Sequence, residues 1–368
     1  MKKILLAPVS LFLLVQISIA QLTTVPDGGN KKATVGERIG LTDVTIHYDR
    51  PGVKGREGKI WGTLVPFGFT DLGFGTSKAA PWRAGANENT TIEFSTDVTV
   101  EGKKLPAGKY GFFIATGKDE STLIFSKNNA SWGSFFYDPK DDALRVNVKQ
   151  QQLNKPVERL KYEFLSETDN GATIALEWEK WQFPFTVETD LDKYQLESFR
   201  KELTSDRGFD YKAWAQAADW AADHNKLEEG LQWADYAVNG KFIGEKNFRT
   251  LSTKAKILSK MGKTDEADAM MKEALPFGTM NEIYAYARQL LAAKKFKEAA
   301  DAFKTNYKKF PNVFTTNMGM VRAMSSEGNF KEALKYAQAA LPQAPDQVNK
   351  TNVESMIEKL KAGKDVNS

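Results

Sequence analysis

The chain has 368 residues and a formal net charge of +4 at pH 7, with 41% apolar and 27% charged residues. This profile is typical of a soluble globular protein, and the length predicts two domains rather than one. Cysteine is absent and only two histidines are present, which excludes disulfides and thiolate chemistry, so we expect neither a metal site nor a cofactor.

The first twenty residues have the pattern of a secretory signal peptide. A basic start at Lys2 and Lys3 precedes an apolar run over residues 4–19, and Ser18 and Ala20 place small residues where a signal peptidase reads them. We predict cleavage after residue 20 and an exported protein, located in the periplasm or outside the cell. The alternative is an uncleaved membrane anchor, which the run is too short to favour because a spanning helix needs about 20 apolar residues.

Removal of this segment leaves 49 Lys and Arg, from 51, against 47 Asp and Glu, so the net charge falls to +2. A charge so close to balance does not indicate nucleic-acid binding. No later stretch is long and apolar enough for a membrane span, so we expect neither a nucleic-acid partner nor a span after cleavage.

Residues 35–187 are predicted to form a β-rich domain. The predicted strands, recognised by period-two alternation between turn residues, are 43–48, 91–100, 109–116, 122–125, 144–148, 160–164 and 173–178. Short strands at this spacing predict an antiparallel β-sandwich or barrel. Residues 61–82 are rich in glycine and aromatics without periodicity, and we expect a long ordered loop there.

Motifs of this half resemble a family known only as domain of unknown function 2911. They include Arg50-Pro51, Gly55-Arg56, Ile60-Trp61-Gly62, Trp82-Arg83-Ala84-Gly85-Ala86-Asn87-Glu88, Lys104-Leu105-Pro106-Ala107-Gly108-Lys109-Tyr110 and Asp141-Asp142-Ala143-Leu144-Arg145-Val146. The resemblance covers about residues 35–185. It implies an exported bacterial protein, often with repeats behind the β domain. It implies no activity, since none is established for the family.

The densest group of polar residues in this half is a candidate ligand site. Its members are Arg50, Arg56, Trp82, Arg83, Asn87 and Glu88. Guanidinium groups beside a carboxylate and an amide suit an anionic ligand, with Trp61 and Trp82 as apolar walls. The alternative is structural: a half-buried Arg–Glu pair, with the asparagine bonding backbone, would fix the loop without any ligand. We favour the structural alternative, because such networks outnumber ligand sites.

Residues 209–362 are predicted to form tetratricopeptide-type helix pairs, after a connector over residues 188–208. Ala267, Ala299 and Ala333 follow similar helix junctions and lie 32 and 34 residues apart, close to the tetratricopeptide period of about 34 residues. A weaker repeat beginning near Tyr211 brings the number to about four, and residues 353–360 would form a capping helix. The predicted fold is therefore α+β in separate domains: an antiparallel β-sandwich or barrel-like domain followed by an all-α solenoid.

A row of cations is predicted on the concave face of this solenoid. The candidate partner-binding residues are Arg249, Lys256, Tyr284, Arg288, Met318 and Arg322. Lys256, Arg288 and Arg322 occupy the same position in successive repeats, which would suit an extended acidic segment or a free C-terminal carboxylate. The alternative is an ordinary solvated surface.

Together these observations favour an exported protein-binding or scaffolding protein without catalytic residues. One alternative is a hydrolase or sugar-modifying enzyme that uses Arg83 and Glu88, with the repeats recruiting its substrate. Another is a carbohydrate-binding β domain in which exposed Trp61, Trp82 and Trp132 stack on sugar rings. An enzyme predicts convergent carboxylates in a pocket, a sugar-binding module predicts a flat row of exposed tryptophans, and a scaffold predicts neither.

Overall fold

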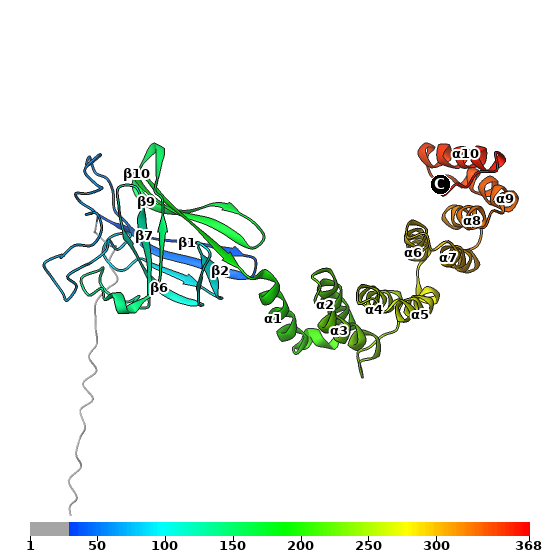
Figure 1. The fold of residues 1–368 in the computed structure, drawn as a ribbon, viewed down its shortest axis with the longest axis horizontal. Coiled ribbons are helices and arrows are strands. Elements are labelled where there is room, and N and C mark those ends of the chain that lie inside the picture. The colour runs from blue at the N-terminus through cyan, green and yellow to red at the C-terminus, as the bar shows by residue number, and fades with distance from the viewer. Residues whose placement is uncertain (1–28) are drawn as a thin grey trace, which may run out of the picture. The chain divides into compact units, whose positions relative to one another are not determined.

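The structure is a computed structural model that describes residues 29–368, so the predicted signal peptide, residues 1–20, lies outside the described residues. The chain divides after Leu191 into two compact units, one of β-strands and one of helices (Figure 1). An antiparallel β domain followed by an all-α array is the fold class that the sequence predicts, and the structure confirms it.

The β unit consists of two antiparallel sheets. The first has the strand order β1-β2-β3-β6-β7-β8 and the second the order β5-β4-β10-β9. Their strands are β1 (Lys31–Ile39), β2 (Thr42–Arg50), β3 (Thr91–Phe94), β4 (Val98–Val100), β5 (Lys103–Leu105), β6 (Gly108–Ala115), β7 (Ser121–Ser126), β8 (Asp142–Val148), β9 (Gln151–Glu167) and β10 (Gly171–Thr189).

The core of this unit lies between the two sheets. Alternation along a strand turns every second side chain inward, as in β2, where Val44, Ile46 and Tyr48 are buried. Phe112 of the first sheet meets Phe185 of the second, with ring centroids 5.7 Å apart. The unit is therefore a β-sandwich.

The structure divides or lengthens several predicted strands. The single strand predicted over residues 91–100 is two strands, β3 and β4, which belong to different sheets because the chain turns between them. There Ser95 N donates to Asp43 O and the Asp97 carboxylate accepts a hydrogen bond from Ala107 N. β9 and β10 run far beyond the predicted 160–164 and 173–178.

The strands that the sequence pattern missed are short or lie at sheet edges. β1 ends one sheet and carries mostly exposed side chains, and β5 has only three residues. β9, of which only residues 160–164 were predicted, has Pro156 in its middle and ends the other sheet. An edge strand tolerates proline and polar side chains on both faces, so the alternation by which a half-buried strand is recognised is weak there.

The predicted long loop is present between β2 and β3. Residues 61–82 contain no extended strand, and isolated bridges join Thr70 to Ala80 and Trp82 to Ile114 of β6. The bridge at Trp82 pins the end of the loop to the first sheet, where Trp82 N donates to Ile114 O and Ile114 N donates to Trp82 O. This loop forms one wall of the cavity in the β unit.

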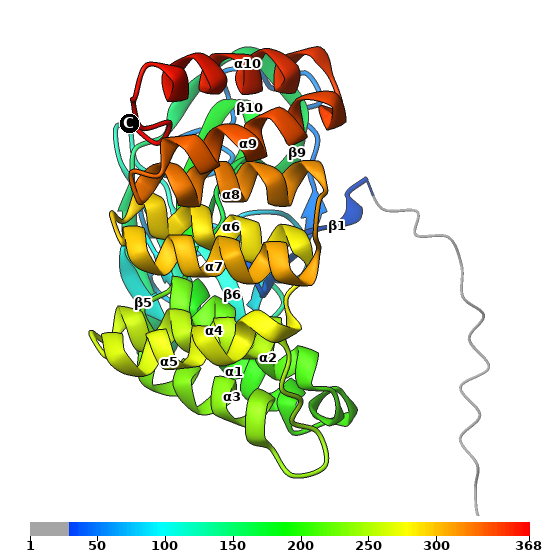
Figure 2. The same ribbon diagram turned by 90° about the vertical axis from the view of Figure 1, so that its right-hand side faces the viewer.

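The helical unit contains ten α-helices in the described part of the chain. They are α1 (Leu191–Leu203), α2 (Tyr211–Asp223), α3 (Leu227–Asn239), α4 (Phe248–Lys260), α5 (Thr264–Ala274), α6 (Met280–Ala292), α7 (Phe296–Lys309), α8 (Phe314–Ser326), α9 (Phe330–Ala340) and α10 (Gln347–Lys361). Helices α2 to α9 form four antiparallel pairs that stack in order, followed by α10 (Figure 2). None of the helices within residues 29–368 has the length and apolar character needed to cross a bilayer.

The small residues of the repeat pattern allow the helices of each pair to approach closely. Ala267, Ala299 and Ala333 are all buried. Gly230, which occupies the corresponding position in the first repeat, lies so close to α2 that a β-carbon there would come within 3.0 Å of the Ala221 methyl group. The predicted connector, residues 188–208, contains the end of β10 and helix α1, whose Leu196 and Leu203 pack on the first helix pair.

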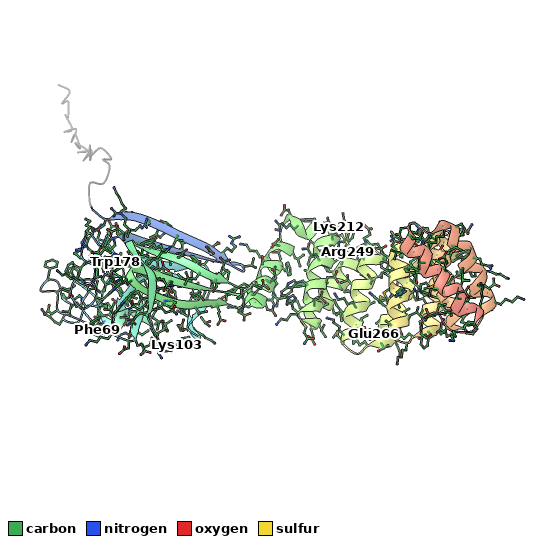
Figure 3. All side chains as sticks on the ribbon, turned by 90° about the horizontal axis from the view of Figure 1, so that it is seen from above. Phe69, Lys103, Trp178, Lys212, Arg249 and Glu266 are labelled. Carbon is green, nitrogen blue, oxygen red and sulfur yellow. The ribbon has the colours of Figure 1, made fainter. Side chains whose placement is uncertain are left out.

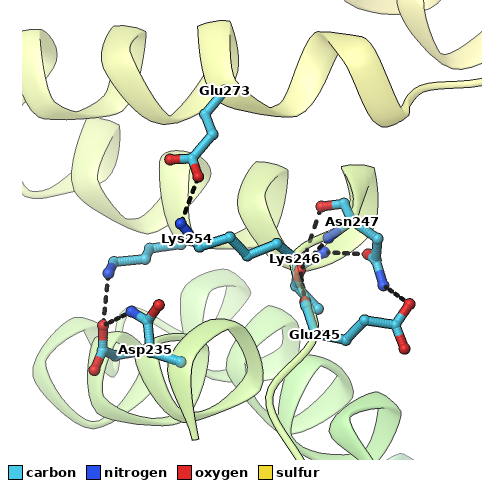
Figure 4. A network of polar contacts seen from close by, with 8 residues as sticks. Asp235, Glu245, Lys246, Asn247, Lys254 and Glu273 are labelled. Carbon is cyan, nitrogen blue, oxygen red and sulfur yellow. Dashed lines mark hydrogen bonds and ion pairs between the residues drawn. The ribbon is translucent and has the colours of Figure 1, made fainter.

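A polar network joins the first repeat to the second (Figure 4). Lys254 of α4 donates to the Asp235 carboxylate of α3 at 2.6 Å, and Lys246 donates to Glu273 of α5 at 2.7 Å. Asn247 caps α4 by accepting a hydrogen bond from the backbone N–H of Thr250 at 3.0 Å. The network therefore fixes the inter-repeat loop against three helices.

Candidate functional site

A cavity of about 450 Å³ lies in the β unit beneath the long loop. Residues with polar groups in its wall include Lys54, Arg56, Arg83, Ser134 and Trp178, and no aspartate or glutamate is among the lining residues. Three of the residues predicted from sequence, Arg56, Trp82 and Arg83, line this cavity. The other three, Arg50, Asn87 and Glu88, do not.

A cluster of tryptophans forms the inner wall of the cavity. Trp82 lies nearly parallel to Trp178 with ring centroids 5.9 Å apart, and Trp61 stacks on Trp181 at 4.9 Å. Trp178 comes from β10 and lies inside the β unit (Figure 3). Its indole N–H is buried and has no hydrogen-bond partner among the described residues.

Arg83 is held by neighbours that the sequence analysis did not identify. Its Nη1 donates to the backbone oxygen of Asn87, its guanidinium lies over the Phe135 ring with 5.2 Å from Cζ to the centroid, and Gly133 lies directly against it. Burial lowers the pKa of Arg83. No carboxylate among the described residues forms an ion pair with it. Residues 133 and 135 lie about fifty positions away in sequence, and no local motif connects them to Arg83.

The other two arginines predicted here bond backbone oxygens. Arg56 donates from Nε to Val53 O at 2.8 Å and from Nη2 to Gly52 O at 2.7 Å, which fixes its side chain at the cavity wall. Arg50 donates from Nε to Leu160 O at 2.9 Å. Arg50 therefore joins β2 to β9 and has a structural contact outside the cavity.

The half-buried Arg–Glu pair of the structural alternative does not form among the described residues. Glu88 forms an ion pair with Lys32 at 2.5 Å instead, and 48% of its side chain is exposed. Asn87 does not bond backbone with its side chain either, because its Nδ2 donates to the Asp49 carboxylate at 3.2 Å. Asp49 is buried, and this burial raises its pKa while the hydrogen bond from Asn87 opposes the rise. The chain turns through a positive φ of 54° at Asn87, so adjacent side chains leave in different directions.

The tryptophans do not form a flat exposed row. Trp61 and Trp82 pack edge to face with centroids 5.6 Å apart, and both are partly buried against the core of the sandwich. Trp132 alone of the three proposed for sugar binding is widely exposed, at 57%. Within residues 29–368, no group of three or more His, Cys, Asp or Glu side chains is placed to hold a metal ion.

A second and larger hollow, of about 710 Å³, lies in the helical unit between the second and third helix pairs. Its walls come from α4 and α5 on one side and from α6 and the start of α7 on the other. We call it the inter-repeat cleft. Apolar side chains lining it include Phe248, Met271 and Leu290, and polar ones include Ser252 and Gln289.

The cleft separates two hydrophobic cores. The core of α3, α4 and α5 lies on one side and the core of α6 to α10 lies on the other, and Tyr286 packs against both. Burial raises the pKa of Tyr286 to about 12, with smaller contributions from the charges of Asp268 and Glu298. Asp268 is also paired with Lys295 of the third repeat at 3.2 Å. Few contacts other than these connect α5 to α6.

The cations predicted on the concave face differ in their surroundings. Lys256 lines the cleft but is paired with Asp223 at 2.9 Å and Asp219 at 3.5 Å. Arg249 also lines the cleft. Arg249 and Arg288 are exposed, and their guanidinium groups form no ion pair with the described residues. Arg249 lies at the start of α4, on the same edge of the unit as Lys212 and opposite Glu266 (Figure 3).

The remaining members of the predicted row are partly or wholly covered. Met318 is only 4% exposed and belongs to the core of the last repeats. Tyr284 is half-buried, with its ring centroid 5.5 Å from that of Phe303. Arg322 is covered by the chain beyond α10: Asn367 Nδ2 donates to Arg322 O at 3.0 Å, and the Asn367 side-chain oxygen accepts from Arg322 Nη1 at 3.4 Å. The row is therefore not a continuous exposed stripe.

Comparison with known families agrees with the resemblances inferred from the sequence. Residues 30–187 match the family described as "Protein of unknown function (DUF2911)". Residues 290–353 match a tetratricopeptide repeat family. Both resemblances predicted from the sequence are thereby confirmed. No curated protein matches the chain.

Among solved structures, the helical unit is similar to several tetratricopeptide proteins. YrrB, described as a TPR protein with an unusual peptide-binding site, is 18% identical, with 47% of this chain and 88% of YrrB covered and a TM-score of 0.32. A tetratricopeptide repeat protein from Parabacteroides merdae is 16% identical over 47% of this chain and 72% of its own, with a TM-score of 0.32. MamA is 13% identical, with 42% of this chain and 88% of MamA covered and a TM-score of 0.30.

Proposed function

We propose that the protein is an exported, non-enzymatic binding protein whose helical repeats hold an extended segment of a protein partner. The segment would lie in the inter-repeat cleft, and the existence of that cleft on the first helices of two successive pairs is the observation that carries the proposal. Stacked repeats characteristically present such a surface to their partners.

The cleft has the size and composition of a binding site. Ligand pockets commonly have volumes of about 300–1,000 Å³ and combine apolar walls with a few polar groups, and this cleft has about 710 Å³. Met271 and Leu290 could bury an apolar side chain of the partner. Ser252 and Gln289, whose side chains can both donate and accept hydrogen bonds, could bond its extended backbone.

The charge distribution favours an acidic segment near one edge of the cleft. Arg249 lines the cleft, and Arg288 lies on α6 three positions after the lining residue Ala285, so it borders the same surface. Neither guanidinium has a carboxylate partner among the described residues. Lys256 contributes less, since Asp219 and Asp223 already compensate its charge.

Export is proposed from the leader pattern of residues 1–20 together with the family resemblance. The non-enzymatic part of the proposal is supported by the β unit. Catalysis by paired carboxylates needs acidic groups that converge on a pocket, but the residues lining the β cavity include no aspartate or glutamate. The edge-to-face packing of Trp61 and Trp82 likewise disfavours a sugar-stacking surface.

A display experiment tests the binding role. A library of random peptides is selected on the immobilised chain, and the selected peptides are then measured against Ala285→Trp and Ala269→Trp. Both alanines are exposed on helices, but only Ala285 lines the cleft. We expect Ala285→Trp to abolish binding and Ala269→Trp to retain it. Selection of no peptide, or equal binding by both variants, would contradict the proposal.

A further inference from the structure

We propose that the cavity of the β unit binds a small organic carboxylate with a flat apolar body. The inference concerns a different domain from the inter-repeat cleft and does not depend on the function proposed above. It follows from four properties of the cavity: an excess of cations, two preorganised guanidinium groups, a buried indole N–H without a partner among the described residues, and an apolar aromatic wall.

The excess of cations indicates an anionic ligand. Lys54, Arg56 and Arg83 line the cavity, while no acidic residue does. Arg83 is partly buried, and burial of a cation without a counter-charge is costly. The lowered pKa of Arg83 reflects that cost. A ligand carboxylate in the cavity would supply the missing negative charge.

The guanidinium groups are fixed before any ligand binds. Arg83 lies between Gly133 and the Phe135 ring, and its one hydrogen bond to protein comes from Nη1, to Asn87 O. Its Nε and Nη2 therefore remain available. Arg56 is held by two backbone oxygens. A planar guanidinium whose orientation is already set matches the two oxygens of a carboxylate at a low entropic cost.

Neutral donors in the wall also favour a ligand group that accepts hydrogen bonds. The Ser134 side chain is only 2% exposed and its hydroxyl forms no hydrogen bond with the described residues. The buried indole N–H of Trp178, another lining residue, also lacks a partner. Arginine, lysine and tryptophan side chains donate hydrogen bonds but do not accept them. Asn30, Thr70 and Ser134 can also accept hydrogen bonds, but the charged groups in the wall are all donors, so a ligand group rich in acceptors complements it best.

The rest of the wall selects an organic body over a mineral anion. Leu64, Val65, Pro66, Leu72, Ala80 and Pro81 contribute apolar surface. Trp82 and Trp178, which stack on each other, add aromatic surface to the wall. A volume of about 450 Å³ exceeds what a phosphate ion fills and is in the range of small-ligand pockets, about 300–1,000 Å³.

Benzoate, benzamide and inorganic phosphate are the probes that test this assignment. Each is titrated into the full chain by calorimetry and by tryptophan fluorescence. Benzamide has the shape of benzoate without its charge, and phosphate has charge without the apolar body. We expect saturable binding of benzoate only. Failure to bind benzoate, equal binding of benzamide, or binding of phosphate in preference would each overturn the proposal.

Variants locate the site. We expect Arg83→Gln and Arg56→Gln each to weaken benzoate binding about tenfold or more, because each removes charge-assisted hydrogen bonds, and Arg83→Lys to restore part of the loss. Arg38→Gln is the matched control, since Arg38 pairs with Asp43 on the exposed β1 and does not line the cavity. If Arg38→Gln weakens binding as much as the cavity variants, the site is elsewhere.

Lys54→Gln keeps the proposal testable if an arginine variant fails to fold. The Lys54 side chain is exposed and its ammonium bonds no described residue, so its removal leaves the fold intact. We expect benzoate binding to weaken about threefold; unchanged affinity in Lys54→Gln and Arg56→Gln together would overturn the assignment. Ala285→Trp in the cleft should leave benzoate binding unchanged, so this test and the peptide test fail independently.

Discussion

Gly133 lies directly against the guanidinium group of Arg83: a β-carbon at residue 133 would be 2.1 Å from Arg83 Cζ and 2.3 Å from Nη1. The backbone at Gly133 has a φ of +68°, which favours glycine. Two separate demands, one conformational and one steric, therefore act on the same residue.

The substitution Gly133→Ala should destabilise the β unit more than Gly58→Ala. Gly58 has the same φ of +68°, but a β-carbon there would have nothing within 4 Å, so Gly58→Ala measures the backbone strain alone, about 1–2 kcal/mol. At residue 133 we expect about 1–3 kcal/mol more from the collision with Arg83. The loss in the free energy of unfolding of each variant is measured by urea unfolding, with hydrogen exchange of the β6 amides as the probe of the β unit. Equal losses would show that Arg83 moves aside without cost.

The adjacent residues Asn87 and Glu88 should respond very differently to replacement by alanine. Asn87→Ala leaves the buried Asp49 carboxylate without its amide donor, and we expect a loss of about 1–3 kcal/mol in the free energy of unfolding. Glu88→Ala removes only an exposed ion pair with Lys32, which is worth about 0–1 kcal/mol. The same unfolding assay distinguishes them. A larger loss for Glu88→Ala would reinstate the structural role that the sequence suggested for it.

The Asp235–Lys254 pair should make the helical unit sensitive to acid. The hydrogen bond from Lys254 holds the pKa of Asp235 below its ordinary value, about 3.9 for aspartate. The contribution of this pair to the stability of the fold is therefore present at pH values above the ordinary pKa of aspartate. It is lost as the pH falls through the lowered pKa of Asp235 in the folded state. Because 55% of the Asp235 side chain is exposed, we expect only a few tenths of a kcal/mol up to about 1 kcal/mol.

Thermal unfolding of Asp235→Asn across pH 2–7 tests that linkage. The variant should be less stable than the wild type at pH 7 and equal to it at the acid end. Asp301→Asn is the control, since Asp301 is an exposed helical aspartate without an ion pair among the described residues. A stability difference that does not change with pH would show that Lys254 does not favour the ionised form.

Reversing the charge of Arg249 and Arg288, the two unpaired cations beside the cleft, should change which peptide charge the protein prefers. With Arg249→Glu and Arg288→Glu combined, we expect acidic peptides selected on the wild type to bind about tenfold or more weakly. Lys308→Glu with Lys331→Glu makes the same change of net charge with two exposed lysines that do not line the cleft. A similar loss in that control would indicate a general electrostatic effect, which salt would screen.

The sequence predicted the elements whose patterns are local. Alternation located the interior strands β2, β6 and β7 as well as β8, and the recurring alanines located the helix pairs, because both patterns reflect burial on one face. The pattern failed at β1 and over most of β9, which lie at sheet edges where little is buried. The alternation could not show that residues 91–100 form two strands in different sheets, since the segments that become β3 and β4 have similar sequence patterns.

The candidate site was predictable only in part. The Trp82-Arg83 motif and Arg56 were identified, because clustered arginine and tryptophan are visible in the sequence itself. Ser134 and Trp178 reach the same cavity from distant segments, and only tertiary packing brings them there. The direction of a side chain was equally hidden: Glu88 was placed with Arg83 by proximity in sequence, whereas the positive φ at Asn87 turns it toward Lys32.

The junction at Tyr286 between the core of α3 to α5 and the core of α6 to α10 limits the cooperativity of the helical unit. In a linear array, folding is transmitted only through interfaces between neighbours, so the least extensive interface sets how far the stability of one end supports the other. That interface is here the one lined by the cleft. A peptide seated between the two halves would add contacts at this point, and we expect it to convert two semi-independent folding units into one.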